Sequence, residues 1–250
     1  MLVTGCANRQ VIATTLPEWE QRFQITTEEV PAQVILSPNK QLVVVGWKNS
    51  ARLYDARTGE PATKMLRHDD VGGTFGLFGA FTPDGRLLVT GGSQDLSVRV
   101  WDTQTGEQAV PPIKLDTDLL ALRVSPDGKW VATASYQSAL LWSLRTGYEV
   151  ALPIRASGVN DLTFSRDGQK LALATRGGTP ILWHLPPNLP DMPNEFLIFA
   201  GRIAGQRLAQ HGILESTPFA ELQSPDRMGF DPALNEWIRD WCLRLPLKSI

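Results

Sequence analysis

The 250-residue chain carries a formal net charge of −2, and charged residues of both signs are interspersed along it. This pattern lacks the basic footprint of a protein that binds nucleic acid or an anionic membrane. No apolar run reaches the roughly 18 residues that a membrane span needs, and two cysteines, Cys6 and Cys242, are too few for a disulfide framework or a cysteine-based metal site. We therefore expect a soluble, cytoplasmic protein with no nucleic-acid partner.

One sequence unit recurs from the N-terminus to about residue 185. Each unit has a polar turn, an apolar run and a second run that ends in an aromatic residue. The turns are Ser37-Pro38-Asn39, Thr82-Pro83-Asp84-Gly85, Ser125-Pro126-Asp127-Gly128 and Ser165-Arg166-Asp167-Gly168. The closing aromatics are Tyr54, Trp101, Trp142 and Trp183, which are 47, 41 and 41 residues apart. A period near 40 predicts a repeat architecture.

Each unit predicts short strands joined by tight turns. In one turn Pro126 presets φ, Asp127 can bond its own backbone and Gly128 supplies a positive φ. The runs that follow such turns, for example residues 87–91 and 130–134, are apolar almost without alternation, which is typical of a strand buried on both faces of its sheet. A third turn then leads to a more polar outer strand. Four strands per unit make one propeller blade.

These residues closely resemble the WD-repeat β-propeller family, whose blades carry a Ser-Pro-Asp-Gly turn and a Trp-Asp pair at the end of the third strand. The resemblance covers roughly residues 1 to 185 and recurs at a fixed period. It implies an all-β fold: a β-propeller of four-stranded blades, with about four and a half blades present. The best match is the unit of residues 66–113, which ends its third strand in Trp101-Asp102.

The resemblance also implies a buried polar tetrad in that blade, in which a carboxylate orients an imidazole and an indole caps a hydroxyl. The structural tetrad falls on His68, Thr90, Asp95 and Trp101. The place of the aspartate is taken in the other units by Lys48, Tyr136 and Gly177. We therefore expect packing alone to hold those blades.

The repeat region begins and ends inside a blade. Met1-Leu2-Val3-Thr4-Gly5 aligns with residues 87–91, and the prolines at 186, 187 and 190 interrupt the pattern before the last unit has a fourth strand. The predicted domain spans residues 1–187, with blades at about 1–28, 30–68, 69–115, 116–155 and 156–185. This gives about eighteen strands, whereas a seven-bladed ring needs roughly twenty-eight.

The missing strands lead to the hypothesis that the chain is the C-terminal portion of a larger propeller protein. A five-bladed ring with incomplete end blades is the alternative. In either case the open blade edges favour self-association unless they are covered.

Residues 188–250 predict a helical C-terminal extension. Apolar residues from Phe196 to Leu208 follow helical spacing after a cap at Asn194, and Asp231-Pro232 begins a second amphipathic stripe that ends near Leu245. Residues 205–214 resemble a segment that follows the propeller in bacterial proteins that fuse a serine/threonine kinase domain to WD repeats. That resemblance implies a kinase domain upstream and no catalysis in this chain.

The favoured function is a non-catalytic scaffold that binds a protein or peptide, as part of a larger signalling or regulatory protein. Candidate partner-binding residues lie in the loops before the innermost strands, where charges of both signs suit a polar partner. These residues are Arg67, Asp69, Asp70, Asp116, Asp118, Arg155 and Ser157. The alternative is that these loops contact only solvent and bind no partner.

A propeller enzyme, a hydrolase or lyase that works in the central channel, is the alternative function. The predicted inner strands offer one carboxylate, Asp161, without the second acid or base that general acid–base catalysis needs. No kinase or hydrolase signature occurs, His184 is expected at an edge, and the residues 72–76 lack the lysine of a phosphate-binding loop. The sequence therefore predicts no enzyme activity, no catalytic residue, no metal and no cofactor.

Overall fold

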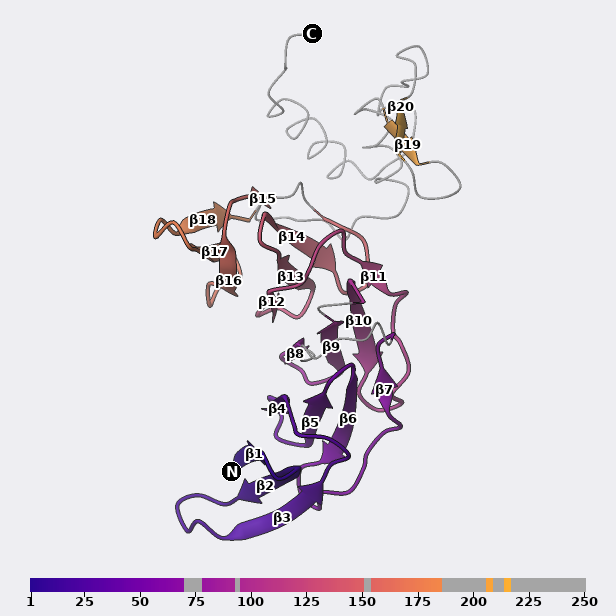
Figure 1. Ribbon diagram of the computed structural model, residues 1–250, viewed down its shortest axis with the longest axis vertical. Helices are drawn as coiled ribbons and strands as arrows, with labels where there is room; N and C mark the ends of the chain where they lie inside the picture. The colour runs from indigo at the N-terminus through magenta and orange to yellow at the C-terminus, as the bar shows by residue number, and fades with distance from the viewer. Residues whose placement is uncertain (70–77, 93–94, 151–153, 186–205, 209–213, 217–250) are drawn as a thin grey trace. The chain divides into compact units, whose positions relative to one another are not determined.

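The computed structural model describes residues 1–69, 78–92, 95–150, 154–185, 206–208 and 214–216 (Figure 1). The chain divides into two compact units, residues 1–187 and 188–250. Within the described residues every regular element is a strand. None of these residues belongs to a helix with the length and apolar character that crossing a bilayer would require.

The described residues of the first unit form five antiparallel sheets in chain order. The first sheet has the strands β1 (Leu2–Cys6), β2 (Gln10–Thr14) and β3 (Gln21–Thr26). The second has β4 (Gln33–Leu36), β5 (Leu42–Trp47), β6 (Ser50–Asp55) and β7 (Leu66–Arg67). The third has β8 (Phe78–Phe81), β9 (Leu87–Gly92), β10 (Ser97–Asp102) and β11 (Ile113–Lys114). The fourth has β12 (Ala121–Val124), β13 (Trp130–Ala134), β14 (Ser138–Ser143) and β15 (Ile154–Arg155). The fifth has β16 (Val159–Phe164), β17 (Lys170–Thr175) and β18 (Ile181–His184).

This order agrees with four-stranded blades flanked by two three-stranded sheets among the described residues. Neighbouring strands within each sheet pair in sequence order, and the innermost strands β4, β8, β12 and β16 each contact the next along the chain. An all-β fold of repeated four-stranded sheets, consistent with a WD-repeat propeller, is therefore present.

The turns behave as the repeated motif predicts. In the third sheet Thr82 Oγ1 donates to Asp84 Oδ1 at 2.6 Å and accepts the Leu87 backbone N–H at 3.0 Å, which closes the turn between β8 and β9. Gly85, like Gly128 and Gly168 in the next two sheets, has a φ near +70°, a conformation that costs glycine little. The polar turn thus sets the reversal in each sheet.

The core consists of apolar layers between successive sheets. Strand β13 is buried at every position, and β5 and β9 are buried at every position but the first, as runs without alternation predicted. One layer combines Val89 and Val100 of the third sheet with Leu122 and Val131 of the fourth. Because each sheet has apolar side chains on both faces, it is stabilised mainly by its neighbours.

The last strand of the fifth sheet, β18, has exposed side chains. In β18, Leu182 is 54% exposed and His184 is exposed, so the edge position expected for this histidine is confirmed. Among the described residues β18 pairs only with β17. Self-association through such open edges stays a prediction.

The prediction of a helical extension is wrong for the residues of the second unit that the structure describes, 206–208 and 214–216. Gln206–Leu208 form strand β19, which pairs antiparallel with β20 (Leu214–Ser216), so the helix predicted to reach Leu208 does not include these residues. Backbone pairing between these two strands outweighs the helical spacing of the apolar residues from which the helix was predicted. The remainder of that prediction, including the stripe from Asp231 to Leu245, lies outside the described residues.

Candidate functional site

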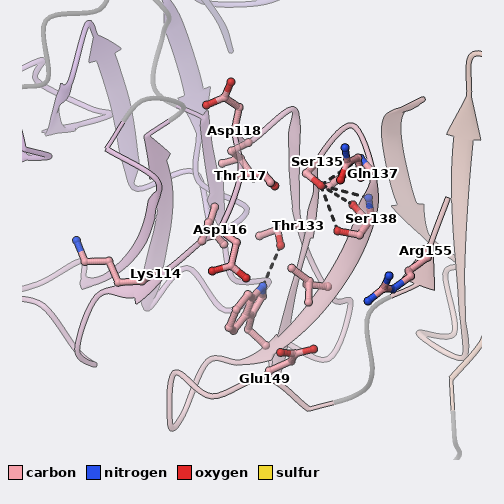
Figure 2. A pocket seen from close by; sticks show the side chains of 15 residues that line it. Lys114, Asp116, Thr117, Asp118, Thr133, Ser135, Gln137, Ser138, Glu149 and Arg155 are labelled. Atoms are coloured by element: carbon pink, nitrogen blue, oxygen red, sulfur yellow. Dashed lines mark hydrogen bonds between the residues drawn. The ribbon is translucent and has the colours of Figure 1, made fainter. Parts of the chain in front are cut away.

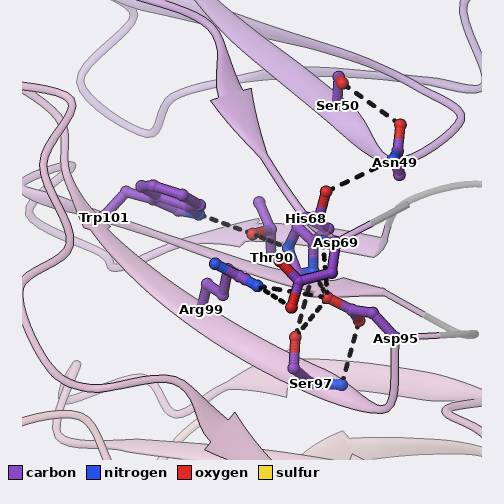
Figure 3. Close-up of polar contacts among 9 residues, drawn as sticks. All are labelled: Asn49, Ser50, His68, Asp69, Thr90, Asp95, Ser97, Arg99 and Trp101. Carbon is purple, nitrogen blue, oxygen red and sulfur yellow. Dashed lines mark hydrogen bonds and ion pairs between the residues drawn. The ribbon is translucent and has the colours of Figure 1, made fainter. Parts of the chain in front are cut away.

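The four residues of the predicted tetrad form one hydrogen-bonded chain in the third sheet (Figure 3). His68 Nδ1 lies 2.8 Å from Asp95 Oδ2, His68 Nε2 lies 2.8 Å from Thr90 Oγ1, and Trp101 Nε1–H donates to Thr90 Oγ1 at 2.7 Å. The donors and acceptors agree if the imidazole carries its proton on Nδ1 and accepts the threonine hydroxyl at Nε2. This network supplies hydrogen-bond partners to polar groups that are buried in the core.

The carboxylate of Asp95 is the centre of this network. It also accepts the Ser97 hydroxyl at 2.6 Å and the Ser97 backbone N–H at 3.1 Å. Burial alone would raise the pKa of Asp95, but the hydrogen bonds from His68 and Ser97 outweigh it and hold the pKa below its usual value. The carboxylate therefore stays charged inside the sheet and fixes the orientation of the imidazole.

Sequence reasoning missed Ser97 and a further member of the network, Arg99, in the middle of β10. Its side chain is only 10% exposed, and its guanidinium lies 2.9 Å from Asp69 Oδ2 and 3.7 Å from Asp95 Oδ2. A long cation at an inward position of a strand, two residues before the tryptophan, was the signal that could have revealed it. Asp69, expected to face a partner, is thus already paired within the chain.

The fourth sheet keeps half of the network, so the expectation that packing alone holds it is wrong. Trp142 Nε1–H donates to Thr133 Oγ1 at 2.9 Å, although Tyr136 replaces the aspartate. The hydroxyl persists because Thr133 occupies the place of Thr90 opposite the third strand. No equivalent indole or phenol bond occurs at Tyr54 or Trp183 among the described residues.

Replacing Trp101 with phenylalanine (Trp101→Phe) is expected to lower the free energy of unfolding by about 1–3 kcal/mol, because it removes the indole donor from a buried network. Urea denaturation of the chain measures this loss. Trp142→Phe is the matched variant, and we expect a smaller loss because Trp142 is half-buried. A change of less than about 0.3 kcal/mol for Trp101→Phe would contradict the proposed role of the network.

The remaining predicted partner-binding residues lie at one end of their sheets, with the exception of Asp70, which lies outside the described residues. Arg67 ends β7 opposite Ser50, and Arg155 ends β15 opposite Ser138. Asp116, Asp118 and Ser157 are exposed in the loops that follow β11 and β15. These loops are equivalent in position, but the structure pairs only Asp69 with an ion partner among the described candidates.

Asp116, Asp118 and Arg155 line a pocket of about 330 Å³ beside the fourth sheet (Figure 2). Glu149, which the sequence did not single out, lines it too. Burial, aided by the charge of Asp116, raises the pKa of Glu149 from 4.5 to about 7. The pocket therefore holds a carboxyl group whose charged form is unfavourable as the chain stands.

The raised pKa of Glu149 predicts a stability that falls between pH 5 and pH 8. A folded pKa near 7 against an ordinary value of 4.5 means that the folded chain holds this proton more tightly, so its contribution is complete below pH 4.5 and is lost as pH rises through 7. Because the group is partly exposed, we expect a loss of about 1 kcal/mol after allowance for solvent screening. Urea denaturation at both pH values should show this loss in the original chain and not in Glu149→Gln. Glu107→Gln, at an exposed carboxylate, should keep it.

Asp161, the carboxylate on which the alternative enzyme hypothesis rests, already has partners within the chain. Its Oδ1 forms an ion pair with Arg123 Nη2 at 2.8 Å and accepts the Leu162 backbone N–H at 2.8 Å. Within the described residues, no three His, Cys, Asp or Glu side chains gather in a way that could hold a metal ion. The polar network of the third sheet is structural, because its groups are buried and paired with one another, and the pocket beside the fourth sheet is a candidate site.

Two segments match the family model of the WD domain, G-beta repeat (WD40), at residues 75–102 and 115–143. These two segments are therefore similar to WD40 repeats. The first matched segment carries Thr90, Asp95 and Trp101 of the tetrad, and the second carries Thr133 and Trp142. The WD-repeat resemblance of the sequence is thus supported in the two sheets where an indole–threonine bond is found.

The chain is also similar to three curated proteins. The chain is 29% identical over 136 residues to "Periodic tryptophan protein 2 homolog" of Schizosaccharomyces pombe, covering 53% of this chain and 15% of the relative. It is 22% identical over 186 residues to "Target of rapamycin complex subunit LST8" of Mus musculus, covering 71% of this chain and 56% of the relative. It is 26% identical over 171 residues to "Pre-mRNA-processing factor 19 homolog 2" of Arabidopsis thaliana, covering 66% of this chain and 32% of the relative. The chain thus spans about half or less of these relatives.

Proposed function

We propose that the chain is a non-catalytic interaction scaffold whose loops, at the same end of successive sheets, bind a protein or peptide partner. The observation that carries this proposal is the equivalent anchoring of these loops. The backbone N–H of His68 donates to Asn49 at 2.8 Å, that of Leu115 to Leu96 at 2.7 Å and that of Ala156 to Gln137 at 3.0 Å. Loops held in this way lose little conformational entropy when a partner binds.

The comparisons support a scaffold over an enzyme. One relative is named as a subunit of the target of rapamycin complex, and we extend that kind of role, assembly with other proteins, to this chain. Asp161, the one carboxylate on which the enzyme hypothesis rests, forms an ion pair with Arg123, and this supports the scaffold. A place within a larger signalling or regulatory protein, a bacterial source, an upstream kinase domain and a cytoplasmic location stay predictions.

Quantitative cross-linking in cells that naturally make the protein tests the scaffold. The variant Asp116→Ala/Asp118→Ala removes two exposed carboxylates from the loop after β11. We expect at least one cross-linked protein to fall about fivefold or more with this variant, which corresponds to roughly 1 kcal/mol of binding energy.

The matched control is Glu60→Ala/Glu107→Ala, which removes two exposed carboxylates at the opposite end of the second and third sheets. These residues follow the turns at the ends of β6 and β10, whereas the proposed contact loops lie near the beginnings of those strands. Equal loss of partners in both variants, or loss in neither, would remove this end of the sheets as the contact site.

A further inference from the structure

The third and fourth sheets pair their strands in the same register, but equivalent positions carry side chains of different charge. Arg99 lies opposite Thr90 in the third sheet, and Leu140 lies opposite Thr133 in the fourth. The tryptophan two residues later donates to that threonine in both sheets. Arg99 and Leu140 therefore occupy equivalent places, so each sheet can be used to interpret the other.

In the third sheet this place holds a guanidinium. Arg99 Nη2 lies 2.9 Å from Asp69, which stands two residues after the end of β7 (Figure 3). Burial of an arginine costs free energy unless carboxylates compensate its charge, and here Asp69 and Asp95 do so.

In the fourth sheet the carboxylate is kept and the guanidinium is lost. Asp116 stands two residues after the end of β11, as Asp69 does after β7, but the arginine is replaced by Leu140. The second carboxylate comes from another position, because Glu149 forms a backbone β-bridge with Trp142 where Gln108 forms one with Trp101. The equivalent site thus has two carboxylates again, Asp116 and Glu149, but neither the guanidinium of Arg99 nor the carboxylate of Asp95, whose place Tyr136 takes.

The space beside these groups is the pocket of about 330 Å³, within the range of small-ligand sites. Leu140, Trp142, Asp116 and Glu149 all line it. Neither of the two carboxylates forms an ion pair with another described residue. Figure 2 shows Asp116 and Glu149 between Lys114, which extends away from them, and Arg155 on the other side.

We propose that this pocket binds the guanidinium of an arginine side chain from a protein partner, in the place that Arg99 takes in the third sheet. The planar fork of a guanidinium can reach two carboxylates at once, and an aromatic lining favours it over an ammonium group. The pKa of Glu149, raised toward 7, agrees with a carboxyl that lacks a cation. The inference rests on the proposed function, because it names what the scaffold recognises.

Nuclear magnetic resonance of the chain with ¹⁵N-labelled tryptophan tests the pocket directly. The probe is N-acetyl-arginine amide, and its neutral control is N-acetyl-citrulline amide, which has the same shape without the charge. We expect a saturable shift of the Trp142 indole signal with the arginine probe, and about tenfold weaker binding of the citrulline probe. Equal effects of both probes, or none, would overturn the proposal.

Two substitutions connect the effect to the residues. Asp116→Asn should weaken binding of the arginine probe about tenfold, because it removes a charge-assisted hydrogen bond. Leu140→Arg should abolish binding, because it supplies the guanidinium from within the chain, whereas Leu140→Met should retain it. The Trp101 indole signal, in the neighbouring sheet, reports whether each variant is folded. Unchanged binding in Asp116→Asn and in a folded Leu140→Arg would also overturn the proposal.

The probe requires no protein partner, so the two proposals fail in different ways. If the cross-linked partners depend on the loop after β11 while the arginine probe does not bind, the scaffold stands and the arginine pocket is wrong. If the probe binds but no partner depends on that loop, the pocket stands as a site and the scaffold proposal is wrong.

Discussion

Asp95→Ala is expected to lower the free energy of unfolding by about 3–5 kcal/mol, the largest effect of any single substitution considered for this chain. The side chain is 2% exposed and lies 2.8 Å from His68 Nδ1, 2.6 Å from the Ser97 hydroxyl and 3.7 Å from Arg99. Its loss leaves a buried guanidinium with one carboxylate in place of two and an imidazole without its acceptor. Urea denaturation followed by tryptophan fluorescence measures the change.

Tyr136→Ala is the matched control, because Tyr136 stands two residues before Ser138 as Asp95 stands two residues before Ser97. Tyr136 is 49% exposed, and its ring contacts Arg176 at the surface. We expect a loss of about 1 kcal/mol or less for this variant. Similar losses in the two variants would mean that the carboxylate does not organise the third sheet.

Gly92→Ala is expected to cost about 2–3 kcal/mol through crowding of the same network. A Cβ atom at this position would lie 2.2 Å from Asp95 Oδ1 and 2.8 Å from His68 Nδ1. Neither group can move away without breaking the hydrogen bonds that join them. Thermal and urea denaturation should both show the loss.

The contrast for this variant is Gly177→Ala in the fifth sheet's turn. Among the described residues, no atom lies within 4 Å of a Cβ at Gly177, and its φ does not fall in the positive region. We expect a neutral effect or a gain of up to about 1 kcal/mol, because alanine restricts the unfolded chain. If Gly92→Ala were as well tolerated, the close approach at Gly92 would not be real.

The repeat, the turns and the buried strands could be predicted because each depends on local signals. Gly85, Gly128 and Gly168 occupy turns that require a positive φ, and the apolar run Trp130–Ala134 is continuous because both faces of β13 are covered. The tetrad could be placed because the resemblance to WD-repeat blades implies it at His68, Thr90, Asp95 and Trp101, at fixed offsets from turns and strand ends. Such offsets survive in a single sequence because the strand period fixes which side chains face inward.

The pairing of charged side chains could not be predicted, because it depends on which strands become neighbours. Asp69 was expected to be free for a partner, but the loop after β7 brings it to Arg99 in the next sheet. The ion pair of Asp161 with Arg123 was not predicted either, because it depends on β16 lying beside β12. The helical spacing before Leu208 was overruled in the same way, since β19 pairs with β20.

The sequence was therefore sufficient for the architecture of repeated four-stranded sheets, since φ preferences and apolar periodicity act over a few residues. Only the tertiary structure decided which polar groups are satisfied within the chain and which remain for a partner. Glu149 illustrates the difference, because nothing in its immediate sequence indicates a carboxyl that is partly buried beside Asp116 without a cation. Desolvation and charge proximity are properties of space rather than of sequence distance, so they appear only when the sheets are packed.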